Sequence, residues 1–155
     1  MIKNLKLALG LGAGMWAVMF IGISALMVTP LLAIWQTILE IILSGLAAFV
    51  LARFYFKKNP GDIKDGLILG IAWFIVGGIL DLLVTIQYVK AGGSYLSGLK
   101  SFYGMWSLWV GFLLMFIGIV LAAKLTRGGE LIKTQPQAPA PKVPPTSPVP
   151  PSQKF

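Results

Sequence analysis

The sequence predicts an all-α membrane protein, a bundle of four transmembrane helices followed by a disordered, proline-rich C-terminal tail. Hydrophobic residues make up 57% of the 155 residues and charged residues only 12%, whereas soluble domains are about a quarter charged. Four apolar stretches are each long enough for the roughly 20 helical residues that cross a bilayer. The end of the chain then becomes rich in proline, which favours an extended chain without a packed core.

The four apolar stretches define the expected membrane domain. The predicted spans are about 5–28, 30–56, 66–89 and 102–123, within a domain over 1–127 that precedes a tail over 128–155. A cleaved signal peptide would also begin with positive charge, as this chain does. The first apolar run is about twice the length of a signal-peptide core and lacks a clear small-x-small cleavage site. We therefore expect an uncleaved first helix.

The segments between the spans carry helix-start and turn signals. Thr29 can cap the second helix, and Pro30 suits its first turn, where no backbone donor is needed. Asp62 can cap the third helix, with Asp65 favourable in its first turn. The Gly- and Ser-containing segment 90–101 is expected to be a loop.

Basic residues predict the orientation in the membrane. Of the 13 Lys and Arg residues, only Lys90 and Lys100 fall on the side of the first and third loops. Cytoplasmic segments of membrane proteins are enriched in Lys and Arg, so both termini are expected in the cytoplasm, with the chain crossing the cell membrane several times. The net charge of +8 is then a feature of topology, and we expect no nucleic-acid partner.

Two residue types that support much of enzyme chemistry are absent. The chain has no Cys and no His, which removes thiol chemistry and both the commonest metal ligand and the commonest general base near neutral pH. We therefore expect no catalytic residues, no cofactor and no metal site.

Two of the five acidic residues lie inside predicted spans, Glu40 in the second and Asp81 in the third. At about 1.5 Å of helix rise per residue, both lie roughly 14 Å below the outer boundary. Because a short turn joins these two helices, we expect them to pack in contact, with the two acids facing each other. Polar residues on the same helical faces complete the predicted proton or cation site, which comprises Glu40, Asp81, Gln36, Thr37, Ser44 and Thr85.

The charge state of these acids is open to several interpretations. Burying a charged Asp at a helix centre and keeping it neutral at pH 7 both cost about 3 to 4 kcal/mol, so local partners decide. The only basic residues within the predicted spans, Lys6 and Arg53, lie near span ends and away from both acids. We therefore expect at least one of the two acids to be protonated at neutral pH. Asp81 then forms a structural hydrogen bond, belongs to a functional proton or cation site, or faces a partner subunit.

Small residues recur on one face of each predicted helix, as they do where membrane helices pack together. The expected packing positions are Gly10, Gly14, Gly66, Gly70, Gly77, Gly111 and Gly118. Trp16 and Trp73 lie deep in their spans and are expected to be packing residues.

The third span contains the pattern G-x3-G-x2-W-x7-D-L-L, formed by Gly66, Gly70, Trp73 and Asp81 with the two leucines that follow. This pattern resembles small four-helix prokaryotic integral membrane proteins of unassigned activity. The resemblance covers the third span only and implies the architecture without a mechanism. Small multidrug resistance transporters differ, because their membrane glutamate lies in the first helix. Lipoprotein signal peptidases place an acid in the last span, and the fourth span here has none.

Two functions fit these observations. The first is a non-catalytic accessory or scaffold subunit of a membrane assembly, with the glycine faces packing a membrane protein partner or a second copy of the chain. The alternative is a small transporter-like protein with a proton- or cation-responsive site at Glu40 and Asp81. In both cases the lipid bilayer is the immediate surrounding.

Overall fold

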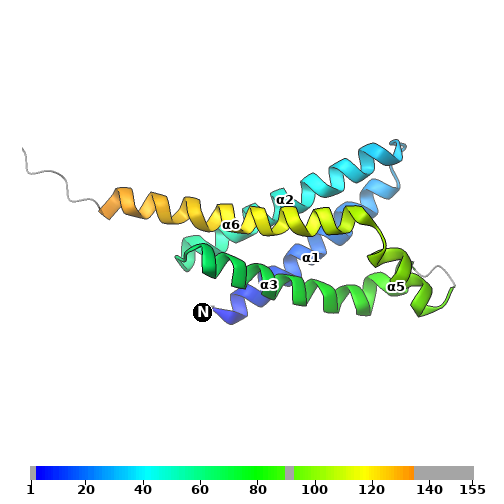
Figure 1. Cartoon of the computed structure of the whole chain (residues 1–155), viewed down its shortest axis with the longest axis horizontal. Helices are drawn as coiled ribbons and strands as arrows, with labels where there is room; N and C mark the ends of the chain where they lie inside the picture. The colour runs from blue at the N-terminus through cyan, green and yellow to red at the C-terminus, as the bar shows by residue number, and fades with distance from the viewer. Residues whose placement is uncertain (1–2, 90–92, 135–155) are drawn as a thin grey trace, which may run out of the picture.

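Four helices in the described part of the chain are long and apolar enough to cross a membrane. The computed structural model describes residues 3–89 and 93–134, and over 127–134 the backbone alone. No strand occurs within these ranges. Figure 1 shows the long helices running roughly along one direction, with the N-terminal end of the first and the C-terminal end of the last at the same end of the bundle. The predicted all-helical fold with four membrane-spanning helices is confirmed, and it fits a multi-pass membrane protein.

The third span is interrupted, and an additional short helix precedes the fourth span. The elements are α1 (Leu5–Met27), α2 (Ala33–Lys58), α3 (Ile63–Leu80), the π-helix η1 (Asp81–Thr85), α4 (Ile86–Val89), α5 (Tyr95–Tyr103) and α6 (Trp106–Thr134). α3, η1 and α4 follow one another without a break and together form the third membrane-spanning helix.

The helices are ordered around the bundle as α2, α1, third span and α6. α2 packs on α1 and α6, and α3 packs on the same two helices. The expected packing of the second helix against the third is therefore wrong, since the two lie diagonally across the bundle and share no extended surface. Small residues explain the preference for α6: a Cβ at Gly118 would lie only 2.6 Å from the Gly45 carbonyl oxygen, so the backbones of α2 and α6 approach closely at this point.

The cap of α3 was predicted correctly, although the helix begins at Ile63 rather than at about 66. Asp62 accepts a hydrogen bond from the backbone N–H of Asp65, and the Asp65 side chain accepts one from the backbone N–H of Asp62, which is a reciprocal capping box. At the same end of the bundle, Lys3 Nζ donates a hydrogen bond to the Pro60 carbonyl oxygen. The N-terminus and the turn between α2 and α3 are thereby joined.

The predicted cap of α2 is wrong. The helix begins at Ala33 after Leu32, whose side chain makes no capping hydrogen bond. Thr29 Oγ1 instead donates to the Leu26 carbonyl oxygen, 2.6 Å away, at the end of α1. The last carbonyl groups of a helix have no partners within it, and inside a membrane that deficit is costly. Thr29 therefore completes α1 rather than starting α2.

The expected loop over 90–101 is replaced in part by α5, which Ser94 caps by accepting from the Ser97 backbone N–H. α5 ends at Gly104, where an added Cβ would collide with the Lys100 carbonyl oxygen. This break delays the start of the fourth span from the predicted 102 to Trp106. The backbone of α6 continues to Thr134, beyond the predicted start of the tail; the remainder of the proline-rich tail lies outside the described residues.

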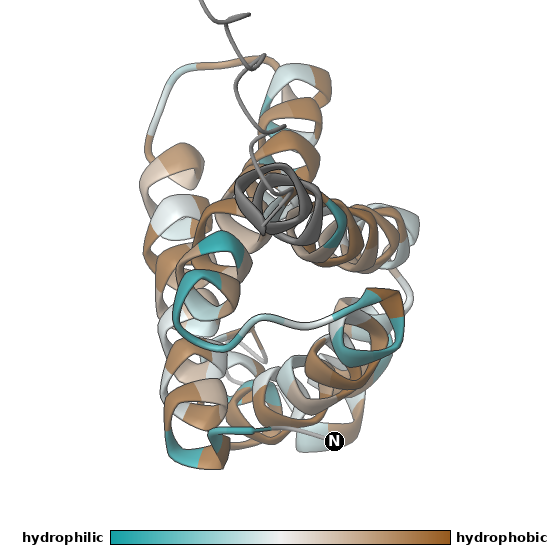
Figure 2. Cartoon of the chain, turned by 90° about the vertical axis from the view of Figure 1, so that its left-hand side faces the viewer, coloured by the Kyte–Doolittle hydropathy of each residue, from teal (hydrophilic) through white to brown (hydrophobic). Residues whose placement is uncertain are grey.

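The two ends of the bundle are packed differently. A core of small and aromatic side chains fills the end that holds the N-terminus, where Ala48, Ala52, Phe56 and Ile119 are buried. Trp73 is also buried, and its Nε1 donates to the Ala8 carbonyl oxygen at 2.8 Å. Figure 2 views this end and shows polar residues gathered at the turns, with apolar residues dominating the helices. The bundle is less tightly filled toward α5, and the candidate site lies there.

Candidate functional site

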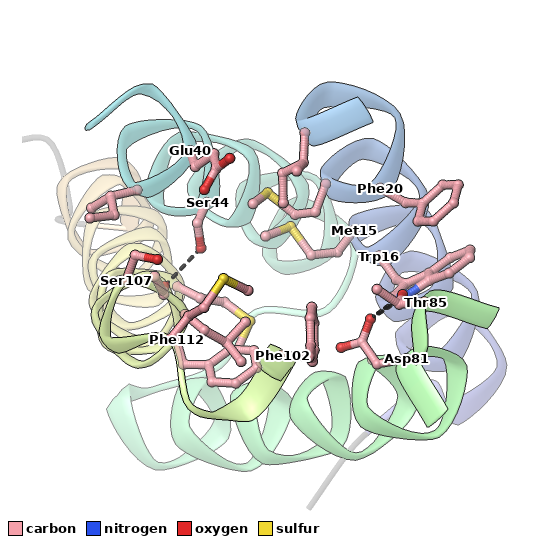
Figure 3. A pocket seen from close by; sticks show the side chains of 18 of the residues that line it. Met15, Trp16, Phe20, Glu40, Ser44, Asp81, Thr85, Phe102, Ser107 and Phe112 are labelled. Carbon is pink, nitrogen blue, oxygen red and sulfur yellow. Dashed lines mark hydrogen bonds between the residues drawn. The ribbon is translucent and has the colours of Figure 1, made fainter. Parts of the chain in front are cut away.

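A cavity of about 200 Å³ lies between the four spans, toward the end of the bundle that carries α5. Most of its wall is apolar and comes from α1, α2, the third span, α5 and α6. Methionine and aromatic side chains from α1, α5 and α6 form much of this wall, including Met15, Met19, Phe20, Phe102, Phe112 and Met115. Figure 3 shows that the labelled side chains come from helices on all sides of the cavity.

Asp81 is the first residue of η1 and lines the cavity. In this π-helix the backbone N–H of Ile86 donates to the Asp81 carbonyl oxygen, five residues back instead of four. Such single π turns are rare and occur frequently at functional sites. The extra residue in the turn shifts the face that the helix presents after Gly77 and Gly78, and Asp81 is buried against the cavity.

Two hydrogen bonds hold one oxygen of the Asp81 side chain. Trp16 Nε1 donates to Oδ1 from α1 at 2.9 Å, and Thr85 Oγ1 donates to the same atom at 2.6 Å. The other oxygen, Oδ2, has no hydrogen-bond partner among the described residues. Trp16 stacks on Phe20 with ring centroids 5.2 Å apart, and Phe20 meets Tyr88 edge to face. Asp81 is therefore fixed in position by an aromatic wall of α1.

Glu40 lies across the cavity on α2, half-buried, and lines the same space. In the described part of the chain no hydrogen bond or ion pair involves its side chain. No Lys or Arg is among the described residues that line the cavity. The structure thus brings Glu40 and Asp81 to one cavity from diagonally opposite helices, without a hydrogen bond between them.

The remaining predicted site residues are divided between the cavity and other roles. Ser44 and Thr85 line the cavity, and Ser44 Oγ also donates to the Gly111 carbonyl oxygen at 2.7 Å, which ties α2 to α6. Gln36 points to the end of α1, where its Nε2 donates to the carbonyl oxygens of Leu26 and Thr29. Thr37 is not among the residues that line the cavity.

The predicted packing glycines differ in how closely other helices approach them. Gly66 and Gly70 lie against α6, and Gly118 lies against α2 at the closest approach of two helices. Gly111 contacts Ser44 with room for a methyl group, since an added Cβ would lie 3.7 Å away. The positions without any neighbouring atom within 4 Å of an added Cβ are Gly10, Gly14 and Gly77.

The sequence did not reveal that methionine and aromatic side chains of α1 line the cavity, or that one of them bonds to Asp81. Trp16 was expected to be a packing residue, yet it is the hydrogen-bond donor to Asp81. Met15 and Met19, like Trp16 and Phe20, are four residues apart, so the two pairs lie on neighbouring stripes of one helix. That spacing could have indicated a Met- and aromatic-rich face on α1, but no spacing within one helix indicates which acid on another helix it meets.

The chemistry available in the cavity is that of two carboxyl groups in an apolar, aromatic surrounding. No group of three or more His, Cys, Asp and Glu that could hold a metal ion occurs within residues 3–89 and 93–126. The wall offers few polar atoms besides the two acids, chiefly hydroxyl groups such as those of Ser44 and Thr85. These features suit a small, mostly apolar molecule or a proton better than a metal ion.

Fold and cavity together fit one class, a four-helix multi-pass membrane protein with two acids in a cavity between its apolar helices. A comparison with known proteins finds no matching family model, no matching curated protein and no matching solved structure.

Proposed function

We propose that the protein is a small transporter-like membrane protein whose cavity responds to protons or cations through Glu40 and Asp81. The proposal rests on one observation, that two acids from different helices line a common cavity with no Lys or Arg in its described wall. Ionisable residues inside a membrane are costly and usually mark a pathway or a proton relay. An acid that served only to hold helices together would be satisfied by its neighbours, and Glu40 makes no such hydrogen bond to the residues that the structure describes.

The proposal includes an orientation and excludes an intrinsic enzymatic activity. The N-terminus and the turn between α2 and α3 would face the cytoplasm, because most of the basic residues lie at that end. The cavity would then lie nearer the outer side of the membrane. No hydrogen bond joins the two carboxyl groups in the described part of the chain, and we propose binding or passage rather than bond cleavage.

Infrared titration of the carboxyl groups tests this function. Purified protein in lipid nanodiscs is titrated between pH 4 and pH 9 in sodium, potassium or lithium chloride, with the protonated C=O bands assigned by Glu40→Gln and Asp81→Asn. We expect at least one band that titrates within this pH range. Thr37→Val, one turn from Glu40 and outside the cavity wall, should leave the spectrum unchanged. Bands that are insensitive to both pH and cations would refute the proposal.

One observation favours an accessory subunit as a second candidate. Added Cβ atoms at Gly10 and Gly14 would meet nothing within 4 Å, so these two positions of α1 have open space beside them in the described part of the chain. Faces of this kind pack closely against other membrane helices. Purification in a mild detergent tests it, since a partner subunit should co-purify with the wild-type chain and be lost with Gly14→Leu. Recovery of the lone monomer alone would count against this candidate.

A further inference from the structure

The volume of the cavity limits what it can hold. At about 200 Å³, it is smaller than the roughly 300 to 1,000 Å³ typical of sites for drug-sized ligands. A molecule with a single ring and a compact head group fits this limit. A molecule with several rings does not.

The acidic side chains of the cavity wall favour a positively charged ligand. The described acidic side chains of the wall are Glu40 and Asp81, and no described Lys or Arg opposes them. Asp81 is already engaged through Oδ1 by Trp16 and Thr85, whereas Glu40 has no partner in the described chain. In an apolar surrounding, a carboxylate without a partner attracts a positive charge far more strongly than it would in water. An anionic occupant would find few donors and two acids.

The chemistry of the wall separates organic from inorganic cations. Small hard cations require about six or more oxygen ligands at short distances, and this wall is mostly carbon and sulfur. Aromatic rings instead attract cations that keep an apolar surface, such as quaternary ammonium groups. Trp16, Phe20 and Tyr88 form a continuous aromatic cluster on one side, and methionines such as Met15 and Met19 adapt to irregular shapes.

We propose that the cavity binds a small lipophilic organic cation of the aryl-ammonium type, with Glu40 as the charge partner and the cluster of Trp16, Phe20 and Tyr88 beside the apolar part. This inference rests on the proposed function and specifies its ligand class.

Two probes of nearly equal shape test the inference. Radiolabelled benzyltrimethylammonium carries one positive charge, and neopentylbenzene has the same shape without the charge. Equilibrium dialysis against protein in lipid nanodiscs measures each of them, and empty nanodiscs correct for partition into lipid. We expect saturable binding of about one benzyltrimethylammonium per chain and at least tenfold weaker binding of neopentylbenzene. Tetraphenylphosphonium, a larger cation, should fail to compete.

Variants assign the charge partner. Glu40→Gln should weaken the binding of benzyltrimethylammonium at least tenfold while leaving that of neopentylbenzene within twofold, which also shows that the cavity is intact. Thr37→Val should change neither. Equal binding of the two probes, or no saturable binding of benzyltrimethylammonium, would overturn the inference.

The infrared titration distinguishes a wrong ligand class from a wrong proposed function. If the carboxyl bands respond to sodium or to pH but benzyltrimethylammonium does not bind, the ligand class is wrong and the proposed function stands. If neither response occurs, both are wrong.

Discussion

The indole of Trp16 and the carboxyl group of Asp81 join α1 to the third span through one hydrogen bond of 2.9 Å. Hydrogen bonds between membrane helices contribute about 0.6 kcal/mol on average and reach about 1.7 kcal/mol, because the chain finds other partners when the helices separate. This bond should lie in the upper half of that range, since Asp81 is buried and Oδ1 accepts from a rigid indole.

Replacing Trp16 by Phe removes the donor and retains most of the ring. We expect Trp16→Phe to lower the free energy of unfolding by about 1 to 1.5 kcal/mol, measured by SDS titration in mixed micelles. Trp35→Phe is the matched control. Because Trp35 is 56% exposed on the outer surface of α2, this replacement should lower the free energy of unfolding only slightly. If the two variants lose equal stability, the hydrogen bond contributes nothing.

At the level of single residues, the sequence predicted which side chains are chemically unusual but not their partners. Glu40 and Asp81 stand out because an acid inside an apolar run is costly wherever the helix packs. Of the two donors to Asp81, Trp16 lies 65 residues away on α1, and its identity depends on how the helices are arranged. The local rule that Thr29 caps the following helix failed for a related reason: carbonyl groups at the end of α1 compete for the same hydroxyl group.

The crossing of α2 and α6 is the closest contact between helices that the packing glycines provide. A Cβ at Gly118 would lie 2.6 Å from the Gly45 carbonyl oxygen and 3.2 Å from the Phe49 backbone nitrogen. Both atoms belong to backbone, so neither can move aside without moving α2. At Gly111 the nearest atoms belong to the Ser44 side chain, 3.7 Å from an added Cβ, which is an ordinary contact.

These two glycines make a matched pair. We expect Gly118→Ala to lower the free energy of unfolding by about 2 kcal/mol, because overpacking forces the helices apart. Gly111→Ala should be neutral or slightly stabilising, since Ala is the better helix former. SDS titration of both variants measures the difference. Equal effects would mean that the backbones of α2 and α6 do not approach at Gly118.

The sequence predicted the four spans because each is a long apolar run, and their bounds shifted mainly at the turns. It did not reveal α5, because a segment rich in Gly and Ser reads as a loop until Ser94 caps it. The π-helix was equally hidden, since the inserted residue leaves no mark on an all-apolar pattern. The pairing of helices was wrong because sequence neighbours were expected to touch, whereas the close fit of α2 to α6 places the third span diagonally opposite α2.

For the whole molecule, this diagonal arrangement creates the cavity. If the second and third helices touched, Glu40 and Asp81 could share a proton directly, as the sequence suggested. With α1 and α6 between them, the acids instead lie on opposite sides of a space that the large side chains of α1 and α6 fill only in part. The packed end near the N-terminus holds the helices together, so that the looser end can keep this space open.

The orientation of the four spans in the membrane is a property of the whole chain, and introduced cysteines can test it. The chain has no cysteine, so single introduced cysteines report their own position. Lys6 and Lys57 lie at the end with the N-terminus, and Leu31 and Lys100 lie at the end with α5 (Figure 1). With most basic residues inside, a membrane-impermeant maleimide should label Leu31→Cys and Lys100→Cys in intact cells. It should label Lys6→Cys and Lys57→Cys only after the cells are permeabilised.

The pattern of labelling tests two separate claims. Labelling of all four positions in the opposite sense would reverse the orientation and leave the four-span fold intact, and the cavity would then lie nearer the cytoplasm. Labelling of Lys6→Cys and Lys57→Cys from different sides would contradict the fold itself, because two spans separate these residues and must return the chain to the same side. The orientation thus determines from which side of the membrane an organic cation would reach Glu40.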